Sequence, residues 1–362
     1  MSNTVSNTAN DAGTRTRGAA TLAEPTTGTR SRILGIGGYR PRRVVPNAEI
    51  VDRIDSSDEW IRTRSGIVSR RFADADETVA MMSVAAAREA LDDAGVDASD
   101  VDCILVATVS HLLQTPAVAT IIAAEIGASP AAAFDLSAAC AGFCYGVSLA
   151  SDMIRGGSAK HVLVIGVERL SDLTDPTDRS TAFIFADGAG AAVVGPSDTA
   201  GIGPVVWGSE GERFDMIRQE AYWPVDGFGG EAEGVEPDPE SAKGAHVLRM
   251  DGNPVFRWAS FEMAKVARRA VEAAGITVDD LDAFVPHQAN MRITDAMARQ
   301  LKLPDHVIVA RDIVDQGNTS AASVPLALRR MHDDGETRSG DLALLIAFGA
   351  GLVYAAQVVR LP

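Results

Sequence analysis

Three short segments of this chain carry residue types suited to nucleophilic catalysis. Cys140 lies in F-D-L-S-A-A-C-A-G-F-C-Y-G (134–146), His287 in P-H-Q-A-N and Asn318 in G-N-T-S-A-A-S. A thiolate attacks electrophilic carbon, and an imidazole and an amide can donate hydrogen bonds to a developing oxyanion. The three residue types therefore indicate a cysteine-based site, provided that the fold brings them together.

The surroundings of each residue support this interpretation. Cys140 follows a short β-like run and precedes an apolar helix, and a helix N-terminus favours the thiolate through its dipole and unpaired N–H groups. His287 ends an apolar strand, where side chains of such folds project into a crevice. Gly317 allows a tight turn before Asn318, and Gly349 could bring its backbone N–H close to a substrate oxygen.

Each residue also has a purely structural interpretation. A cysteine in an Ala-rich helix is usually packed in a core, which is the interpretation we favour for Cys103 and Cys144. A histidine after a strand is often only hydrogen-bonded, and Gly-Asn often forms a simple turn or cap. The combination of the three segments is more specific than any one of them.

An internal repeat suggests how these segments are positioned. Residues 87–102, A-R-E-A-L-D-D-A-G-V-D-A-S-D-V-D, align without a gap with residues 267–282 at a shift of 180 residues. Both copies predict an amphipathic helix that ends at a glycine, Gly95 or Gly275. Each copy continues with a buried strand, a helix, a short strand and a second helix rich in Ser and Ala.

The repeat predicts an α/β fold made of two duplicated halves with mostly parallel sheets, covered by helices on both faces. The glycine-rich stretches 185–194 and 347–359 are expected to form hairpin-like ends of the two halves. Cys140 and Asn318 are expected at equivalent places in the halves, so that two helix N-termini converge on one cleft. We expect the halves to span residues 31–200 and 201–362, after a disordered tail of residues 1–30 that is rich in Thr, Ser and Gly.

Bulk composition excludes several classes of protein. The chain has 362 residues and a net charge of −16, which disfavours nucleic acid and anionic membranes as partners. Its 3 cysteines lack the spacing of a zinc site, and no metal is expected. No apolar stretch approaches the ~18 residues of a membrane span, and the tail lacks the apolar centre of a secretory signal. We expect a protein of the reducing cytoplasm.

Longer motifs then point to a family. The chain resembles the β-ketoacyl-acyl-carrier-protein synthase III family of the thiolase-like superfamily, in its actinobacterial branch, from about Ser31 to Pro362. The motifs that carry the resemblance are S-S-D-E-W-I-R-T-R-S-G-I (56–67), A-A-C-A-G-F (138–143), D-P-T-D-R (175–179), F-A-D-G-A-G-A-A-V (185–193), V-P-H-Q-A-N (285–290) and G-N-T-S-A-A-S-V-P (317–325). The resemblance implies a layered α-β-α-β-α architecture and a homodimer.

The resemblance also implies a reaction. Cys140 would accept the acyl group of an acyl-coenzyme A, with the oxyanion held by the N–H groups of Cys140 and Gly349. His287 and Asn318 would then support decarboxylation of malonyl-acyl-carrier protein, and the carbanion would condense with the acyl group to start a fatty-acid chain. Coenzyme A enters as part of a substrate, so no cofactor is expected.

Further residues are assigned by the resemblance alone. It places five residues around coenzyme A, and three arginines where the carrier protein would dock near the entrance. The coenzyme A residues are Trp60, Arg64, Arg179, Gly252 and Asn290, and the docking residues are Arg257, Arg292 and Arg299. Thr115 stands where acetyl-using relatives carry Phe, so we expect a medium-to-long or branched acyl primer.

Three alternatives remain open at this point. A starter-unit synthase of a polyketide pathway would use the same residues. A Cys-His-Asn thioester hydrolase would need the nucleophile but not the coenzyme A and malonyl features. A non-catalytic partner subunit would commonly lack the nucleophile, which this chain retains. A thiolase is disfavoured because residues 347–354 contain no second cysteine.

Overall fold

Two five-stranded sheets with matching strand order form the frame of the protein. The structure is a computed structural model that describes residues 29–219 and 246–362. In order, the first sheet contains β1 (Arg30–Tyr39), β7 (Asp187–Ser197), β6 (Val162–Arg169), β4 (Cys103–Ala107) and β5 (Ala132–Leu136). The second contains β8 (Val206–Ser209), β14 (Val353–Arg360), β13 (Leu342–Gly349), β11 (Ala283–Pro286) and β12 (Ile308–Val309).

The strand directions also match between the two sheets. β4 runs parallel to β5 and β6, while β7 runs antiparallel to β6 and β1. In the same way β11 is parallel to β12 and β13, while β14 is antiparallel to β13 and β8. The predicted hairpin at 347–359 is therefore correct, but the one at 185–194 is wrong, because most of that stretch lies within the single strand β7 and pairs with β6.

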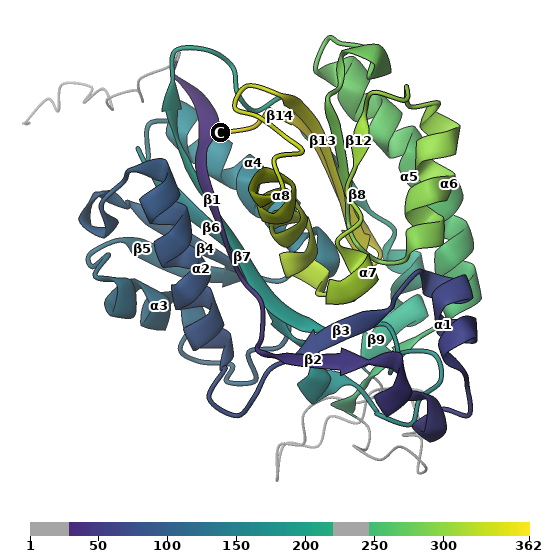
Figure 1. The fold of residues 1–362 in the computed structure, drawn as a ribbon. Helices are drawn as coiled ribbons and strands as arrows, with labels where there is room; N and C mark the ends of the chain where they lie inside the picture. Colours follow the sequence, from purple (N-terminus) through teal and green to yellow (C-terminus); the bar gives the residue numbers. More distant parts are fainter. Residues whose placement is uncertain (1–28, 220–245) are drawn as a thin grey trace, which may run out of the picture.

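The helices complete five layers, as Figure 1 shows. Helices α2 (Val79–Ala94) and α3 (Val118–Ile126) cover the outer face of the first sheet. Helices α5 (Gly252–Ala273) and α6 (Met291–Leu301) form the outer layer next to the second. Helices α4 (Gly142–Arg155) and α8 (Ser323–Asp333) lie between the sheets and contact both. The predicted α-β-α-β-α order is confirmed.

The two repeat helices end as the sequence predicts. Thr78 caps the start of α2 by accepting a hydrogen bond from the Met81 N–H, and Gly95 ends the helix with φ 61°. Gly275 takes φ 74° just after α5. Both glycines adopt the left-handed conformation that other residues avoid, which explains why each copy of the repeat places a glycine here.

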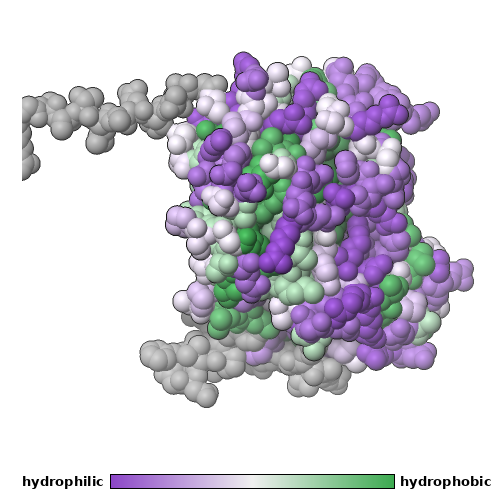
Figure 2. Space-filling view, turned by 60° about the vertical axis from the view of Figure 1, so that its left-hand side comes forward, coloured by the Kyte–Doolittle hydropathy of each residue, from purple (hydrophilic) through white to green (hydrophobic). Residues whose placement is uncertain are grey.

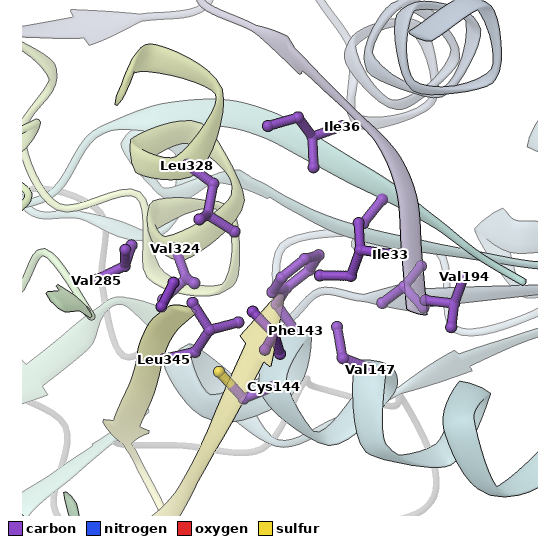
Figure 3. Packing of buried hydrophobic residues seen from close by; sticks show 14 of the residues in the cluster. Ile33, Ile36, Phe143, Cys144, Val147, Val194, Val285, Val324, Leu328 and Leu345 are labelled. Carbon is purple, nitrogen blue, oxygen red and sulfur yellow. The ribbon is translucent and has the colours of Figure 1, made fainter. Parts of the chain in front are cut away.

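The central core lies between the two sheets and is built from α4 and α8. Figure 3 shows Phe143, Cys144 and Val147 of α4 packed with Val324 and Leu328 of α8 and with side chains of both sheets. Phe143 and Cys144 have no exposed surface, and full burial of such an apolar side chain contributes about 1.5–3 kcal/mol. Cys144 is thus a core residue, as the structural interpretation predicts, and so is Cys103 on β4.

Smaller elements lie together in the lower part of Figure 1. They are α1 (Asp58–Ser65), β2 (Arg43–Pro46), β3 (Ser69–Phe72), β9 (Ile217–Gln219), β10 (Leu248–Met250) and α7 (Ile313–Gln316). The predicted tail of residues 1–30 lies outside the described residues up to residue 28, and Arg30 already begins β1. In the two described ranges, no helix is both long and apolar enough to cross a membrane.

Candidate active site

Cys140 sits in a short turn between β5 and α4. The turn is a 3₁₀ helix over Ala139–Ala141, and Ala139 takes the left-handed φ of 44°. The end of β13 packs directly against this turn. A Cβ placed on Gly349 would lie 2.8 Å from the Cys140 nitrogen and 3.0 Å from its Sγ, so only glycine fits. The backbones of Cys140 and Gly349 are therefore adjacent, as an oxyanion site made from both would require.

The second half of the chain repeats this turn at the start of α8. It is the 3₁₀ helix Ser320–Ala322, and Ser320 takes φ 49°, as Ala139 does in the first half. This alignment makes Ala321 the counterpart of Cys140. The expected equivalence of Cys140 and Asn318 is therefore wrong in detail, because Asn318 lies two residues before the second turn. The halves converge as predicted, but they contribute chemistry from different positions.

His287 lies just after β11 and is held from two sides. Its backbone N–H donates to the Ile346 carbonyl at 2.7 Å, and its Nδ1 lies 2.7 Å from the Ser323 hydroxyl. With the Ser323 hydroxyl donating to Nδ1, Nε2 carries the ring proton and is free to donate into the cavity. Burial lowers the pKa of His287 to about 3, so the imidazole is neutral at physiological pH.

Asn318 is fixed between two neighbouring residues of the first half. Its N–H donates to the Ile184 carbonyl at 2.9 Å, and its carbonyl accepts from the Ala186 N–H at 2.8 Å. Its side-chain Oδ1 accepts from the Ser320 N–H at 2.8 Å. Since Oδ1 is used in this way, the Nδ2 group is the part of the amide available as a donor to a ligand.

One cavity of about 540 Å³ contains all three residues. It is lined by Cys140, His287, Asn318 and Gly349, and it extends to residues predicted to hold coenzyme A. The structure thus brings Cys140, His287 and Asn318 together from three separate segments of the chain. The predicted coenzyme A residues that line it are Trp60, Arg64, Arg179, Gly252 and Asn290.

Trp60 and two arginines form one group on the cavity wall. The Arg179 guanidinium carbon lies 4.9 Å from the Trp60 ring centroid, and that of Arg64 lies 5.8 Å from it. Such a group offers an aromatic face and two exposed cations to a ligand that carries a base and phosphates. Asn290 supports the group, because its Nδ2 donates to the Arg64 carbonyl at 3.0 Å while its Oδ1 caps α6.

The state of the thiol differs from the expectation. Burial, together with the negative charge of Glu168, raises the pKa of Cys140 to about 12, although a hydrogen bond from Ser320 and the backbone N–H act in the opposite direction. Desolvation of the charged form outweighs the helix N-terminus here. The resting residue is therefore a thiol, and the neutral His287 is a weak base for it.

Of the other predicted residues, only Arg292 lines the cavity of Cys140. Thr115 is exposed on the loop before α3 and does not line the Cys140 cavity. Arg292 lines that cavity and stacks on Phe256 at 4.8 Å. Arg299 lines a separate groove between α5 and α6, and Arg257 is exposed on α5.

Sequence reasoning missed three polar residues of the site: Glu168, Ser320 and Ser323. Glu168 is fully buried at the end of β6 and is hydrogen-bonded to Ser320. A signal was present in V-L-V-I-G-V-E, where a lone charge closes an otherwise apolar strand. No group of three or more His, Cys, Asp or Glu side chains within 29–219 and 246–362 is arranged to hold a metal ion.

The fold and the site together define a class, the thiolase-like condensing enzymes. Residues 134–211 match the family described as 3-oxoacyl-[acyl-carrier-protein] synthase III, and residues 271–361 match the C-terminal part of the same enzyme. The chain is 60% identical to β-ketoacyl-[acyl-carrier-protein] synthase III 1 of Streptomyces coelicolor over 332 residues, covering 92% of this chain and 96% of that protein.

Solved structures give the same result. The priming β-ketosynthase of the R1128 polyketide pathway superposes with a TM-score of 0.87 at 49% identity, covering 95% of this chain and 99% of that one. The 3-oxoacyl-[acyl-carrier-protein] synthase III of Aquifex aeolicus VF5 gives 0.81 at 37% identity, with 92% and 100% coverage. The chain belongs to the β-ketoacyl-[acyl-carrier-protein] synthase III family. It is a condensing enzyme that initiates fatty-acid synthesis.

Proposed function

We propose that Cys140 carries the acyl group in a two-step condensation. In the first step its sulfur attacks the carbonyl carbon of an acyl-coenzyme A, a new C–S bond forms, and coenzyme A leaves. The N–H groups of Cys140 and Gly349 stabilise the oxyanion of this step. The single observation that supports this role is the close packing of Gly349 on Cys140, which brings the end of β13 next to the backbone and sulfur of Cys140.

In the second step malonyl-acyl-carrier protein loses carbon dioxide. The Nε2–H of His287 and the Nδ2 group of Asn318 donate to the thioester oxygen, where the enolate charge develops. The carbanion attacks the acyl group on Cys140 and releases the 3-oxoacyl-carrier protein. A neutral imidazole suits this role, because its Nε2–H can donate a hydrogen bond to the enolate oxygen. Burial lowers the pKa of His287 to about 3 and so favours this neutral form.

The test is a pair of assays on a Cys140→Ala variant. We expect no covalent acyl-enzyme with radiolabelled acyl-coenzyme A, while slow malonyl decarboxylation persists through His287 and Asn318. An acyl-enzyme that still forms on Cys140→Ala would overturn the assignment. A hydrolase would instead release free acid from acyl-Cys140 without forming a carbon–carbon bond, and product analysis by mass distinguishes the two.

The two substrates are expected to use different parts of the surface. Trp60, Arg64 and Arg179 offer a base-stacking and phosphate-binding group on the cavity wall for coenzyme A. Arg257, Arg292 and Arg299 lie on the adjoining helices α5 and α6, where local positive charge can attract an acidic carrier protein despite the net charge of −16.

We expect a homodimer that pairs the β5 edges of two chains. β5 is the last strand of the first sheet, and Phe134 on it is 43% exposed. Figure 2 views the molecule from the side where β5 and α3 lie, and hydrophobic residues gather on this face. Leu112 and Leu113 of the neighbouring loop are also exposed. An unpaired edge with apolar side chains is a surface that a twofold axis can cover.

This arrangement gives Thr115 its expected role. The Thr115 loop belongs to the same exposed apolar region, so a partner chain could receive it at the acyl end of its own cavity. Thr115→Phe should then shorten the preferred acyl chain in a graded acyl-coenzyme A series. Phe134→Asp should produce monomers by light scattering and remove that effect, whereas an unchanged chain-length profile of Thr115→Phe would contradict the role.

A second function is supported by one comparison. The similarity to a polyketide priming ketosynthase, at 49% identity, fits a starter-unit role with the same residues. Competition between malonyl-loaded carrier proteins of the fatty-acid and polyketide kinds distinguishes the two functions. All three cysteines are free thiols, in keeping with the cytoplasmic location that we propose.

A further inference from the structure

We propose that Glu168 accepts the proton of the Cys140 thiol, through the hydroxyl of Ser320, when Cys140 is acylated. The inference rests on the proposed role of Cys140 as nucleophile. It assigns a function to a buried carboxylate that the reaction as described above does not use. Glu168 acts through Ser320 and is therefore a positioning and proton-holding residue, while Cys140 remains the catalytic one.

The two carboxylate oxygens of Glu168 have different surroundings. Oε2 accepts from the Ser110 hydroxyl at 2.6 Å, the Val109 N–H at 3.1 Å and the Thr108 hydroxyl at 3.3 Å. Oε1 accepts from the Ser320 hydroxyl at 3.1 Å. Because Oε2 is surrounded by donors, a proton that reaches this carboxylate belongs on Oε1, the oxygen that faces Ser320.

Ser320 connects this carboxylate to the nucleophile. Ser320 lines the same cavity as Cys140, and its hydroxyl donates to Glu168. Burial raises the pKa of the Cys140 thiol, and the Ser320 hydroxyl acts against that rise. The turn that carries Ser320 lies tightly on β6, since a Cβ on Gly166 would come within 2.2 Å of the Ala321 carbonyl oxygen. Gly166 thus lets the turn of the second half reach the strand end of the first, which brings the Ser320 hydroxyl to Glu168 on the cavity that Cys140 lines. A proton path would then run from Sγ through Oγ to Oε1.

The path from Cys140 through Ser320 to Glu168 has two proton arrangements in which each hydrogen bond has one donor and one acceptor. In the first, Cys140 S–H donates to Ser320, and Ser320 O–H donates to the Glu168 carboxylate. In the second, protonated Glu168 donates to Ser320, and Ser320 donates to the Cys140 thiolate. Two short proton transfers convert one arrangement into the other, and one negative charge is present in both.

The electrostatics favour sharing of a single charge. Burial raises the pKa of Cys140, and the negative charge of Glu168 raises it further, so the thiolate and the carboxylate are disfavoured together. Burial raises the pKa of Glu168 to about 7, which makes it a proton acceptor matched to neutral pH. His287, with its pKa lowered to about 3, is far less suited to take the thiol proton.

Other charged groups around β6 are engaged elsewhere. Arg169 pairs with Asp172 at 3.2 Å. On β7, Asp187 accepts from the Ala73 N–H and from Ser171. On α2, the carboxylates of Glu89 and Asp93 accept from backbone N–H groups of β1, at Gly38 and Ile36.

The step balances without any further reactant. The Cys140 proton moves to Ser320 as the Ser320 proton moves to Glu168, and the thiolate forms the S–C bond with the acyl carbonyl carbon. When the tetrahedral intermediate collapses, the bond to the coenzyme A sulfur breaks. Protonation of that leaving thiolate regenerates the Glu168 carboxylate, so the net change is exchange of one thioester for another.

The experiment measures alkylation of Cys140 by iodoacetamide from about pH 5.5 to 9, resolved by peptide mass, in full-length enzyme. The variants are Glu168→Gln and Ser320→Ala. Alanine can occupy the left-handed position of Ser320, because Ala139 does so at φ 44° in the equivalent turn. Asp187→Asn is the matched control, because Asp187 is a second fully buried carboxylate whose pKa burial raises, and its oxygens accept from Ser171 and from the Ala73 N–H.

In the natural enzyme the alkylation rate should rise with pH, bend near pH 7 and level off. Both variants should lose this bend, and their rates at pH 7 should fall at least about tenfold, the effect of one pKa unit. The double variant should be no slower than either single variant, because the two residues act in one chain. Asp187→Asn should keep the bend and stay within about twofold of the natural rate, since the Asp187 carboxylate is not part of the path from Cys140 to Glu168.

Three results would overturn the proposal. Faster alkylation in Glu168→Gln would mean that Glu168 acts only by its charge. If the rate of both variants still bends near pH 7, the bend reports the titration of a group other than Glu168. Equal losses in Asp187→Asn would mean that loss of a buried carboxylate acts only through structure. The Cys140→Ala acylation assay tests the nucleophile separately, so a failure of that role cannot be mistaken for a failure of Glu168.

Discussion

Replacing Gly349 with alanine tests the geometry on which the oxyanion site depends. The added Cβ would lie 2.8 Å from the Cys140 nitrogen, 2.9 Å from its Cβ and 3.0 Å from its Sγ. Ordinary contacts are several tenths of an ångström longer, so either the end of β13 or the Cys140 turn must move. The turn leads directly into α4 and contacts the second turn, Ser320–Ala322, and overpacking of this kind costs about 1–3 kcal/mol.

The catalytic effect should exceed the effect on stability. Loss of one oxyanion donor costs about 10²–10³ in rate, and a misplacement of about 1 Å can cost about 10². We therefore expect single-turnover acylation by radiolabelled acyl-coenzyme A to slow by at least about 10²-fold in Gly349→Ala. The melting temperature should fall by about 2–12 °C, since a cost of about 1–3 kcal/mol shifts it by about 2–4 °C per kcal/mol in a large domain.

Gly211→Ala is the matched control for this experiment. Gly211 begins the 3₁₀ helix Gly211–Met216, and a Cβ there would meet no atom within 4 Å. It should acylate at the natural rate, which separates the effect of a methyl group beside Cys140 from that of any glycine replacement. Acylation of Gly349→Ala within about twofold of the natural rate would refute the reasoning, because no oxyanion donor or nucleophile could then have moved.

Three further predictions concern other parts of the molecule. His287→Ala and Asn318→Ala should slow malonyl decarboxylation by about 10²–10³ and acylation far less, as followed by carbon dioxide release; equal losses in both steps would contradict the division of roles. Burial raises the pKa of Asp187 to about 6 in the folded protein, so its contribution to stability is present below about pH 4 and is lost as the pH rises through about 6. Asp187→Asn should therefore flatten the fall in unfolding free energy over that range by about 3 kcal/mol in urea titrations, and an unchanged slope would argue against a raised pKa. Arg299→Glu should raise the KM for malonyl-carrier protein and weaken its salt dependence while sparing acylation, whereas Arg155→Glu at the far end of α4 should change neither; equal effects of the two would exclude docking at Arg299.

Much of the fold could be predicted because the sequence contains an internal repeat, whose two copies predict the same order of elements. The glycines after the repeat helices, Gly95 and Gly275, mark the same helix end twice, and local backbone preference suffices to explain them. The alternation of apolar strands and helices then predicts two sheets, but it predicts them to be mostly parallel, whereas each sheet contains both parallel and antiparallel pairs. It does not predict that β7 is one long antiparallel strand, since pairing with β1 and β6 depends on residues far away in the chain.

The candidate site could be predicted only in its residue types. Cys140, His287 and Asn318 were identified from their segments, and the cavity contains all three. Their proton states were not predictable. A cysteine before a helix suggests a thiolate, but the burial that raises its pKa to about 12 comes from layers packed around it. Thr115 shows the same limit, because its predicted role depends on a second chain.

The sequence by itself determined the duplicated order of elements and the three candidate residues Cys140, His287 and Asn318, because these follow from local patterns of a few residues. The tertiary structure decided which backbone and buried groups surround them. Gly349 meets Cys140 because β13 ends against the turn before α4, and Glu168 meets Ser320 because Gly166 lets the two halves approach closely. Such contacts join residues more than 150 positions apart, where the chemistry is set by packing and desolvation rather than by neighbours in the chain.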